Sequence, residues 1–133
     1  MSRLTVFLAR FMGVFTVVVV LACLLRGPAI IEATAADGPV MFAYAIISLA
    51  TGIAMILGHN VWSGGPLPVV VTLVGWLILA KGLFLFFLGP DSASQLFGQM
   101  GYRNHYYLFL SPAFVIGLYL TWAGFAVSAS RSP

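Results

Sequence analysis

The stretch IAMILGHNVWSGGPLPVVVTLVGWLILAKGLFLFFLGP, residues 53–90, decides the fold of this chain. It joins two apolar runs through a short polar turn that contains two glycines and two prolines. The run before the turn reaches back to Val40, so each run is long enough to cross the ~30 Å hydrocarbon core of a membrane as a helix. Because glycine and proline end helices, the stretch predicts a membrane hairpin.

The composition of the whole chain extends this prediction to a membrane protein. Of 133 residues, 62% are hydrophobic and only 7% are charged, whereas a soluble domain carries roughly 25% charged residues. A bilayer accepts such a sequence provided that the backbone is hydrogen-bonded within helices. We therefore predict an all-α fold, a compact antiparallel four-helix transmembrane bundle that forms a single domain over residues 1–133.

Four spans are expected, at residues 4–25, 40–58, 67–88 and 105–127. We expect a short interfacial helix within 28–39, and the polar segment 91–104 to lie on the membrane surface. The first run also allows a second interpretation as a signal peptide, with Ala33-Thr34-Ala35 as the cleavage site. That run is longer than the apolar part of a typical signal peptide, so we favour an uncleaved helix.

Each predicted span carries one stripe of small residues at helical spacing, the pattern through which membrane helices pack. We expect the four stripes to face the interior of the bundle. They are Gly13, Thr16, Val20, Cys23 and Gly27; Ser48, Gly52, Met55 and His59; Thr72, Gly75, Leu79 and Gly82; and Gly117, Thr121, Gly124 and Ser128.

Four spans place both termini on one face of the membrane, called side A; the opposite face is side B. Basic residues divide three to three, or three to two if Lys81 is discounted for its depth in the membrane. They are Arg3, Arg10 and Arg131 on side A, and Arg26, Lys81 and Arg103 on side B. By the positive-inside rule we place both termini in the cytoplasm.

His59, Asn60 and Trp62 form the first candidate group, in the turn of the hairpin. An imidazole at a helix end can accept a proton, bind a metal or ligate haem. The structural interpretation is a helix cap, with Asn60 closing the helix in the left-handed conformation and His59 favoured by the helix dipole. His59 shares the stripe of its helix, so we expect it to face the bundle. Trp62 is assigned to the aromatic belt on side A.

Lys81 and Trp76 are the second group. Lys81 lies ~10 Å from the end of its helix; it either extends toward side B or faces the bundle with Asp91, Glu32 or a carbonyl as partner. Trp76 lies near the middle of its span and its indole N–H needs an acceptor, so we expect it to turn inward. There it packs in the core or forms the wall of a lipid or quinone pocket.

Arg103 and His105 are predicted to contact lipid headgroups on side B. Because His59 and His105 lie on opposite sides, ~30 Å apart, they cannot be axial ligands of one haem within one chain. The sequence has no set of residues for hydrolysis or group transfer and no basic patch for nucleic acid. We expect a protein that is not an enzyme and has no metal, cofactor or nucleic acid.

The hairpin resembles small uncharacterised bacterial four-span inner-membrane proteins that share a His-Asn-x-Trp turn, a Thr-Leu-x-Gly-Trp-Leu helix and a Lys-Gly pair. The resemblance covers about a third of the chain and implies the fold and a location in the bacterial inner membrane, with no assigned activity. The first span lacks the embedded glutamate of small multidrug transporters. The matching residues are His59, Asn60, Trp62, Thr72, Leu73, Gly75, Trp76, Leu77, Lys81 and Gly82.

Two function classes follow. The first is a non-catalytic accessory or scaffold subunit, with a larger membrane protein or a second copy of the chain as partner besides the lipid bilayer. The alternative is a small oligomeric transporter or a lipid- or quinone-binding protein that uses His59, Trp76 and Lys81. A redox subunit that shares haem between chains is a third interpretation.

Overall fold

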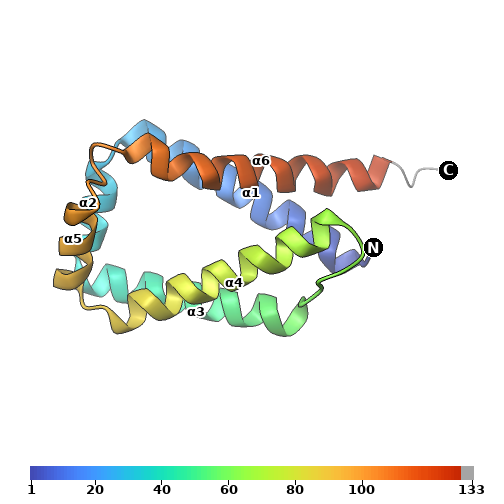
Figure 1. The fold of residues 1–133 in the computed structure, drawn as a ribbon, viewed down its shortest axis with the longest axis horizontal. Helices are drawn as coiled ribbons and strands as arrows, with labels where there is room; N and C mark the ends of the chain where they lie inside the picture. Colours follow the sequence, from blue (N-terminus) through green and yellow to red (C-terminus); the bar gives the residue numbers. More distant parts are fainter. Residues whose placement is uncertain (130–133) are drawn as a thin grey trace.

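The computed structural model describes residues 1–129, apart from the side chains of residues 90, 97, 128 and 129, and in this part the chain forms six α-helices. Ser128 of the fourth stripe and Arg131 of side A therefore lie outside the description of side chains. The helices are α1 (Arg3–Arg26), α2 (Ala29–Ala36), α3 (Gly38–Gly58), α4 (Pro66–Phe87), α5 (Pro90–Gln99) and α6 (Tyr106–Ala129) (Figure 1).

Helices α1, α3, α4 and α6 are long and apolar enough to cross a membrane. They confirm the prediction of an all-α, four-span membrane bundle, and their ends lie within two residues of the predicted ends. Segment 28–39 contains the expected short helix, α2, and most of segment 91–104 forms α5. The Ala33-Thr34-Ala35 triplet lies inside α2, where Ala35 is buried.

The helix ends follow from local chemistry. Gly27 closes α1 with φ at +77°, and Gly64 and Gly65 precede α4 with φ at +89° and +116°. Residues that carry a side chain rarely adopt such backbone angles, so glycine is required at these turns. At the start of α3, the Asp37 carboxylate accepts a hydrogen bond of 3.1 Å from the Val40 N–H.

The spanning helices form two antiparallel pairs, α1 with α6 and α3 with α4. A Cβ atom on Gly13 would lie 2.5 Å from the backbone nitrogen of Thr121, and one on Gly52 would lie 2.6 Å from Cα of Leu79. Only glycine allows the backbones to approach this closely. The expectation that the stripes face other helices is confirmed at these positions: the first stripe packs on the fourth, and the second on the third.

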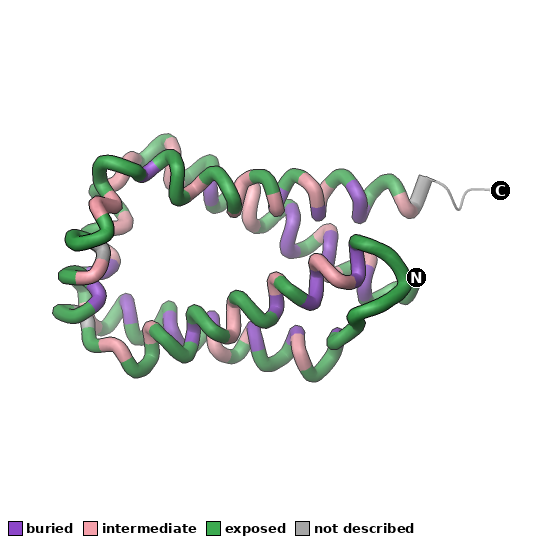
Figure 2. Tube along the Cα trace, viewed as in Figure 1, coloured by how far each residue is buried: buried purple, intermediate pink, exposed green. Residues whose placement is uncertain are grey.

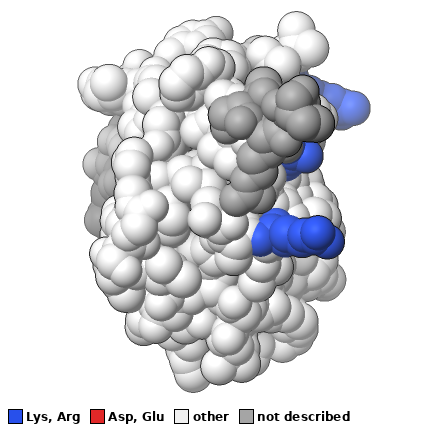
Figure 3. All heavy atoms as spheres, turned by 90° about the vertical axis from the view of Figure 1, so that its right-hand side faces the viewer, with Lys and Arg blue, Asp and Glu red and all other residues white. Residues whose placement is uncertain are grey.

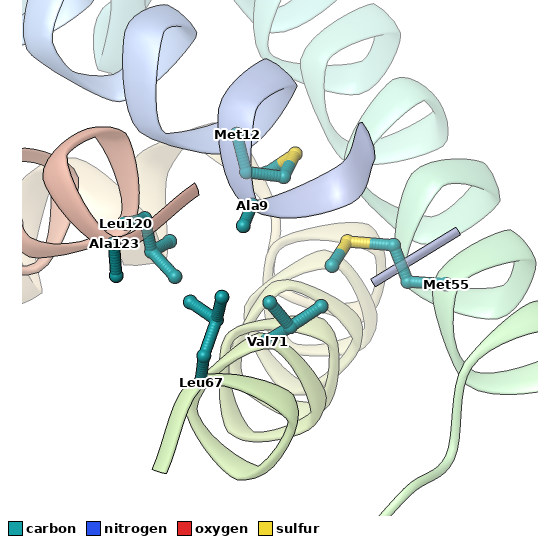
Figure 4. Close-up of a cluster of buried hydrophobic side chains, with 7 residues drawn as sticks. All are labelled: Ala9, Met12, Met55, Leu67, Val71, Leu120 and Ala123. Carbon is teal, nitrogen blue, oxygen red and sulfur yellow. The ribbon is translucent and has the colours of Figure 1, made fainter. Parts of the chain in front are cut away.

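The two pairs meet at side A, the end that holds the N-terminus, and diverge toward side B (Figure 1). Figure 2 shows buried positions along the facing sides of each pair, with intermediate and exposed positions elsewhere. At the junction, one buried apolar cluster draws on all four spanning helices (Figure 4). Its members are Ala9, Met12, Met55, Leu67, Val71, Leu120 and Ala123.

At side B, α2 and α5 lie side by side across the ends of the pairs, and Ser94 Oγ donates a hydrogen bond of 3.3 Å to the Ala35 carbonyl.

The charges are distributed unevenly between the two ends. Figure 3 shows lysine or arginine and no visible aspartate or glutamate on the face at side A. The three acidic residues of the chain, Glu32, Asp37 and Asp91, lie in or beside α2, α3 and α5 at the opposite end. The acidic residues thus lie at the end opposite the buried cluster.

Candidate functional site

His59 lies at the side A end of α3, between α1 and α4. It is only 3% exposed, and both ring nitrogens are hydrogen-bonded to hydroxyl groups. Nε2 lies 2.9 Å from Thr5 Oγ1 in α1, and Nδ1 lies 3.2 Å from Thr72 Oγ1 in α4. The prediction that His59 faces the bundle is confirmed, and its imidazole joins three helices.

The Thr72 hydroxyl determines which nitrogen of His59 carries a proton. This hydroxyl accepts a hydrogen bond of 3.0 Å from the Val61 N–H and donates one of 2.9 Å to the Val61 carbonyl. A hydroxyl has one hydrogen to donate and two lone pairs. Because its hydrogen is used by Val61, the remaining lone pair must accept a hydrogen from Nδ1–H of His59.

The Nε2 side of the ring leads to the start of α1. Thr5 Oγ1 lies 2.7 Å from Ser2 Oγ, and Ser2 in turn caps α1 by accepting a hydrogen bond of 3.1 Å from the Thr5 N–H. In the neutral ring, Nε2 accepts the Thr5 hydroxyl hydrogen, and the Ser2 hydroxyl donates to Thr5. We call Ser2, Thr5, His59, Val61 and Thr72 the His59 network.

The turn differs from prediction in one respect. His59, not Asn60, is the residue that caps α3: its backbone is extended, with φ at −148°, and its N–H donates to the Met55 carbonyl at 2.6 Å. Among the described residues only glycines have positive φ, so the left-handed Asn60 cap was wrong. The physical reason is that the turn folds back on Thr72, which requires extended backbone after α3. Asn60 Oδ1 instead accepts a hydrogen bond of 2.8 Å from the indole N–H of the exposed Trp62.

Trp76 does not turn inward. It is 44% exposed, so the expected core position was wrong. The neighbouring Gly75 faces α3, where an added Cβ would lie 3.1 Å from Met55 Cβ. With 3.6 residues per turn, the next residue points about 100° away from that contact, toward the outside of the pair.

Lys81 has a partner that the sequence did not suggest. Its Nζ donates a hydrogen bond of 2.7 Å to the hydroxyl of Tyr44 in α3, at an exposed position. The predicted partners Asp91, Glu32 and a carbonyl do not bond to it within the described part of the chain. His59, Trp76 and Lys81 therefore lie in three separate environments.

Arg103 and His105 lie on side B, in the turn between α5 and α6, at the opposite end from His59. Both are exposed; Arg103 Nη1 lies 3.8 Å from Glu32 Oε2, and His105 Nδ1 lies 3.3 Å from the Gly101 carbonyl. Their contact with lipid headgroups stays a prediction. Nearby, burial raises the pKa of the Tyr102 hydroxyl, and Tyr106 adds to the effect.

Sequence reasoning missed the residues that join distant segments. Thr5 reads as an ordinary first-turn residue, and Arg10 as a topology signal. Arg10 Nε donates to the Gly124 carbonyl at 2.9 Å, and its guanidinium lies 4.8 Å from the centre of the Phe125 ring. Tyr106, at the start of α6, is 2% exposed and donates a hydrogen bond of 2.5 Å to the Cys23 carbonyl. Each contact links α1 to α6.

No family model matches the chain, and neither a curated protein nor a solved structure is similar to it at a significant level.

In chemical terms, the His59 network is a closed set of internal hydrogen bonds. Every buried polar side-chain atom in the described residues has a partner. No group of three or more His, Cys, Asp or Glu side chains in that part of the chain is placed to hold a metal ion. What the network does is tie the N-terminus of α1 to the turn between α3 and α4, at the point where the two pairs meet.

Proposed function

We propose that this chain is a non-catalytic accessory or scaffold subunit of a larger assembly in the bacterial inner membrane, with both termini in the cytoplasm. The observation that carries the proposal is the state of His59, the best candidate for chemistry in the sequence. Both of its ring nitrogens are engaged by Thr5 and Thr72. A histidine used in this way stabilises a helix junction and leaves no nitrogen for a substrate or metal.

The outer surface of the spans is open to a partner as well as to lipid. Within a continuous apolar stretch of 18 residues in each spanning helix, only 22–28% of the residues are buried within the chain. The small-residue stripes are buried between the two helices of each pair. Large side chains therefore cover the outer surface of the pairs. On α1 three of them, Phe7, Phe11 and Phe15, are exposed and stack in series with 6.1 Å between ring centres. In a membrane such a surface lies against lipid tails or against the helices of a partner protein.

The test is co-purification from the native membrane. A tagged full-length chain, expressed at its native level, is extracted with its surrounding lipid in a membrane-solubilising copolymer, and the eluate is quantified by mass spectrometry. A tagged, unrelated four-span protein serves as the control. The proposal predicts one or more larger membrane proteins at a fixed ratio to this chain and absent from the control. Recovery as a lone monomer or homodimer contradicts it.

The alternative, a small transporter or a lipid- or quinone-binding protein that uses His59, Trp76 and Lys81, has less support. One of these residues is buried in a hydrogen-bond network, one is exposed and one is bonded to Tyr44. If it held, replacing His59 and Lys81 together by Ala would abolish transport or binding in a protein that still inserts.

A further inference from the structure

A cavity lies at side B, between α2, α5 and the turn that leads into α6. Its volume is about 450 Å³, which is within the range of small-molecule sites. Small residues of α2 and α5 form much of its lining and leave the space open. Its polar side chains are Glu32, Ser94, Tyr102, Arg103 and Asn104. Nothing in the sequence suggested this cavity, because its walls come from segments far apart in the chain.

The two charged groups of the cavity face each other without a close hydrogen bond. Arg103 Nη1 lies 3.8 Å from Glu32 Oε2, longer than the roughly 2.7–2.9 Å of a charge-assisted hydrogen bond. The side chains are 72% and 42% exposed. Within the described residues neither side chain has another polar partner. The guanidinium therefore has N–H donors, and the carboxylate has lone pairs, available to a ligand.

The position of the cavity restricts what the ligand can be. Helices α2 and α5 lie across the ends of the four spans (Figure 1). Since a span of 24 residues is about 36 Å long, its ends reach the headgroup region of a bilayer. The groups present there at high concentration are phospholipid headgroups. A cavity that holds one guanidinium and one carboxylate is complementary to a headgroup with one anionic and one cationic group.

We propose that this cavity binds a phosphodiester that carries a primary ammonium group, the chemistry of a phosphatidylethanolamine headgroup. The phosphate accepts hydrogen bonds from Arg103, whose planar guanidinium suits phosphate oxygens. The ammonium group donates to Glu32, and the Asn104 amide lies at the same cavity. Glu32 disfavours anionic headgroups, and a quaternary ammonium has no N–H to donate to it. Lipid binding at this site is a property in addition to the proposed scaffold role and does not depend on that role.

The experiment measures lipid binding to the purified, delipidated full-length chain by native mass spectrometry. Phosphatidylethanolamine, phosphatidylglycerol and phosphatidylcholine with identical acyl chains are titrated separately. The proposal predicts that phosphatidylethanolamine binds about fivefold more tightly than either of the others, the size of one partly exposed charge contact. Soluble glycerophosphoethanolamine is titrated in parallel. If the intact lipid binds more tightly than the soluble compound, the natural ligand is the lipid. If the two bind equally, the natural ligand is the soluble phosphodiester.

The variants separate this site from general lipid adhesion. Glu32→Gln is expected to remove the preference for phosphatidylethanolamine over phosphatidylglycerol. Arg103→Gln is expected to weaken the binding of phosphatidylethanolamine by about fivefold. Two control variants, Asp91→Asn and Arg26→Gln, remove one negative and one positive charge on the same side but outside the cavity lining. They are expected to change neither the lipid preference nor the affinity for phosphatidylethanolamine. Because Glu32 and Arg103 are exposed, the variants should keep the helical content of the native chain by circular dichroism. Equal binding of the three lipids, or an unchanged preference in Glu32→Gln, overturns the proposal.

Discussion

Thr72 Oγ1 lies 3.2 Å from Nδ1 of His59 and exchanges two hydrogen bonds with the backbone of Val61. One hydroxyl thereby fixes the side chain that ends α3 and the backbone of the turn that follows. Its own hydrogen-bonding capacity is filled. Thr72, near the start of α4, thus holds the turn of the hairpin in place. The His59 imidazole links this turn to α1 through its hydrogen bond with Thr5.

Replacing Thr72 by Val should destabilise the junction. The variant keeps the shape of the side chain but leaves the Nδ1–H of His59 and the Val61 N–H without their acceptor. We expect a loss of about 1–3 kcal/mol in the free energy of unfolding, measured in mixed micelles. Thr72→Ser keeps the hydroxyl and should lose much less. Equal stability of Thr72→Val and the native chain would show that the hydroxyl has no structural role.

The close approach of α3 and α4 makes Gly52 intolerant of any side chain. In Gly52→Ala, the new Cβ meets Leu79 Cα at 2.6 Å, so the helices must separate. We expect a loss of about 1–3 kcal/mol in the free energy of unfolding. Gly58→Ala, in the same helix, meets its nearest atom at 3.9 Å, and should be neutral or slightly stabilising. A similar effect of both substitutions would contradict the packing described here.

The pair Lys81–Tyr44 should contribute little energy. Its hydrogen bond is exposed, and exposed polar pairs contribute ~0.2–1 kcal/mol. A double-mutant cycle with Lys81→Met and Tyr44→Phe is expected to give a coupling energy in that range, with normal insertion of all variants. A coupling of several kcal/mol, or failure of Lys81→Met to insert, would instead indicate a buried lysine with a functional or folding role.

Tyr102 predicts a stability change at alkaline pH. Burial raises its pKa above the ordinary value, which is about 10. In the window that starts near pH 10 and ends at the raised pKa, the unfolded chain has lost the Tyr102 proton and the folded chain retains it. The folded state therefore becomes less stable as pH rises through this window. Tyr102→Phe should reduce that slope in alkaline unfolding experiments; an identical slope would mean that Tyr102 titrates normally.

The spans could be predicted from the sequence because their signals are local. Apolar length and the Gly27-Pro28, Gly65-Pro66 and Gly89-Pro90 pairs set the helix ends to within two residues. The stripes also predicted which face each helix buries, including that of His59. They could not predict which stripe pairs with which, since every stripe is made of similar small residues. The pairing of the helices depends on steric fit between residues far apart in the sequence, such as Gly13 in α1 and Thr121 in α6.

The candidate site was only partly predictable for a related reason. Thr5 precedes His59 by 54 residues, and no local pattern links the two. The indole N–H of Trp76 predicts an inward position, but the geometry of its helix places the side chain outside. Gly75 faces α3, and that contact directs its neighbour outward. The cavity at Arg103 and Glu32 depends on the contact of α2 with α5, which again has no local signal.

The proton position on His59 tests the central claim most directly, namely that His59 is a structural tie between α1, α3 and α4. In a His105→Ala variant labelled with nitrogen-15 histidine, His59 is the one labelled residue, and solid-state NMR in bilayers distinguishes its two ring nitrogens. The account predicts a protonated Nδ1 whose proton lies in contact with the Thr72 side chain, and loss of that contact in Thr72→Val. An unprotonated Nδ1, or a ring without contacts to Thr72 and Thr5, would contradict it.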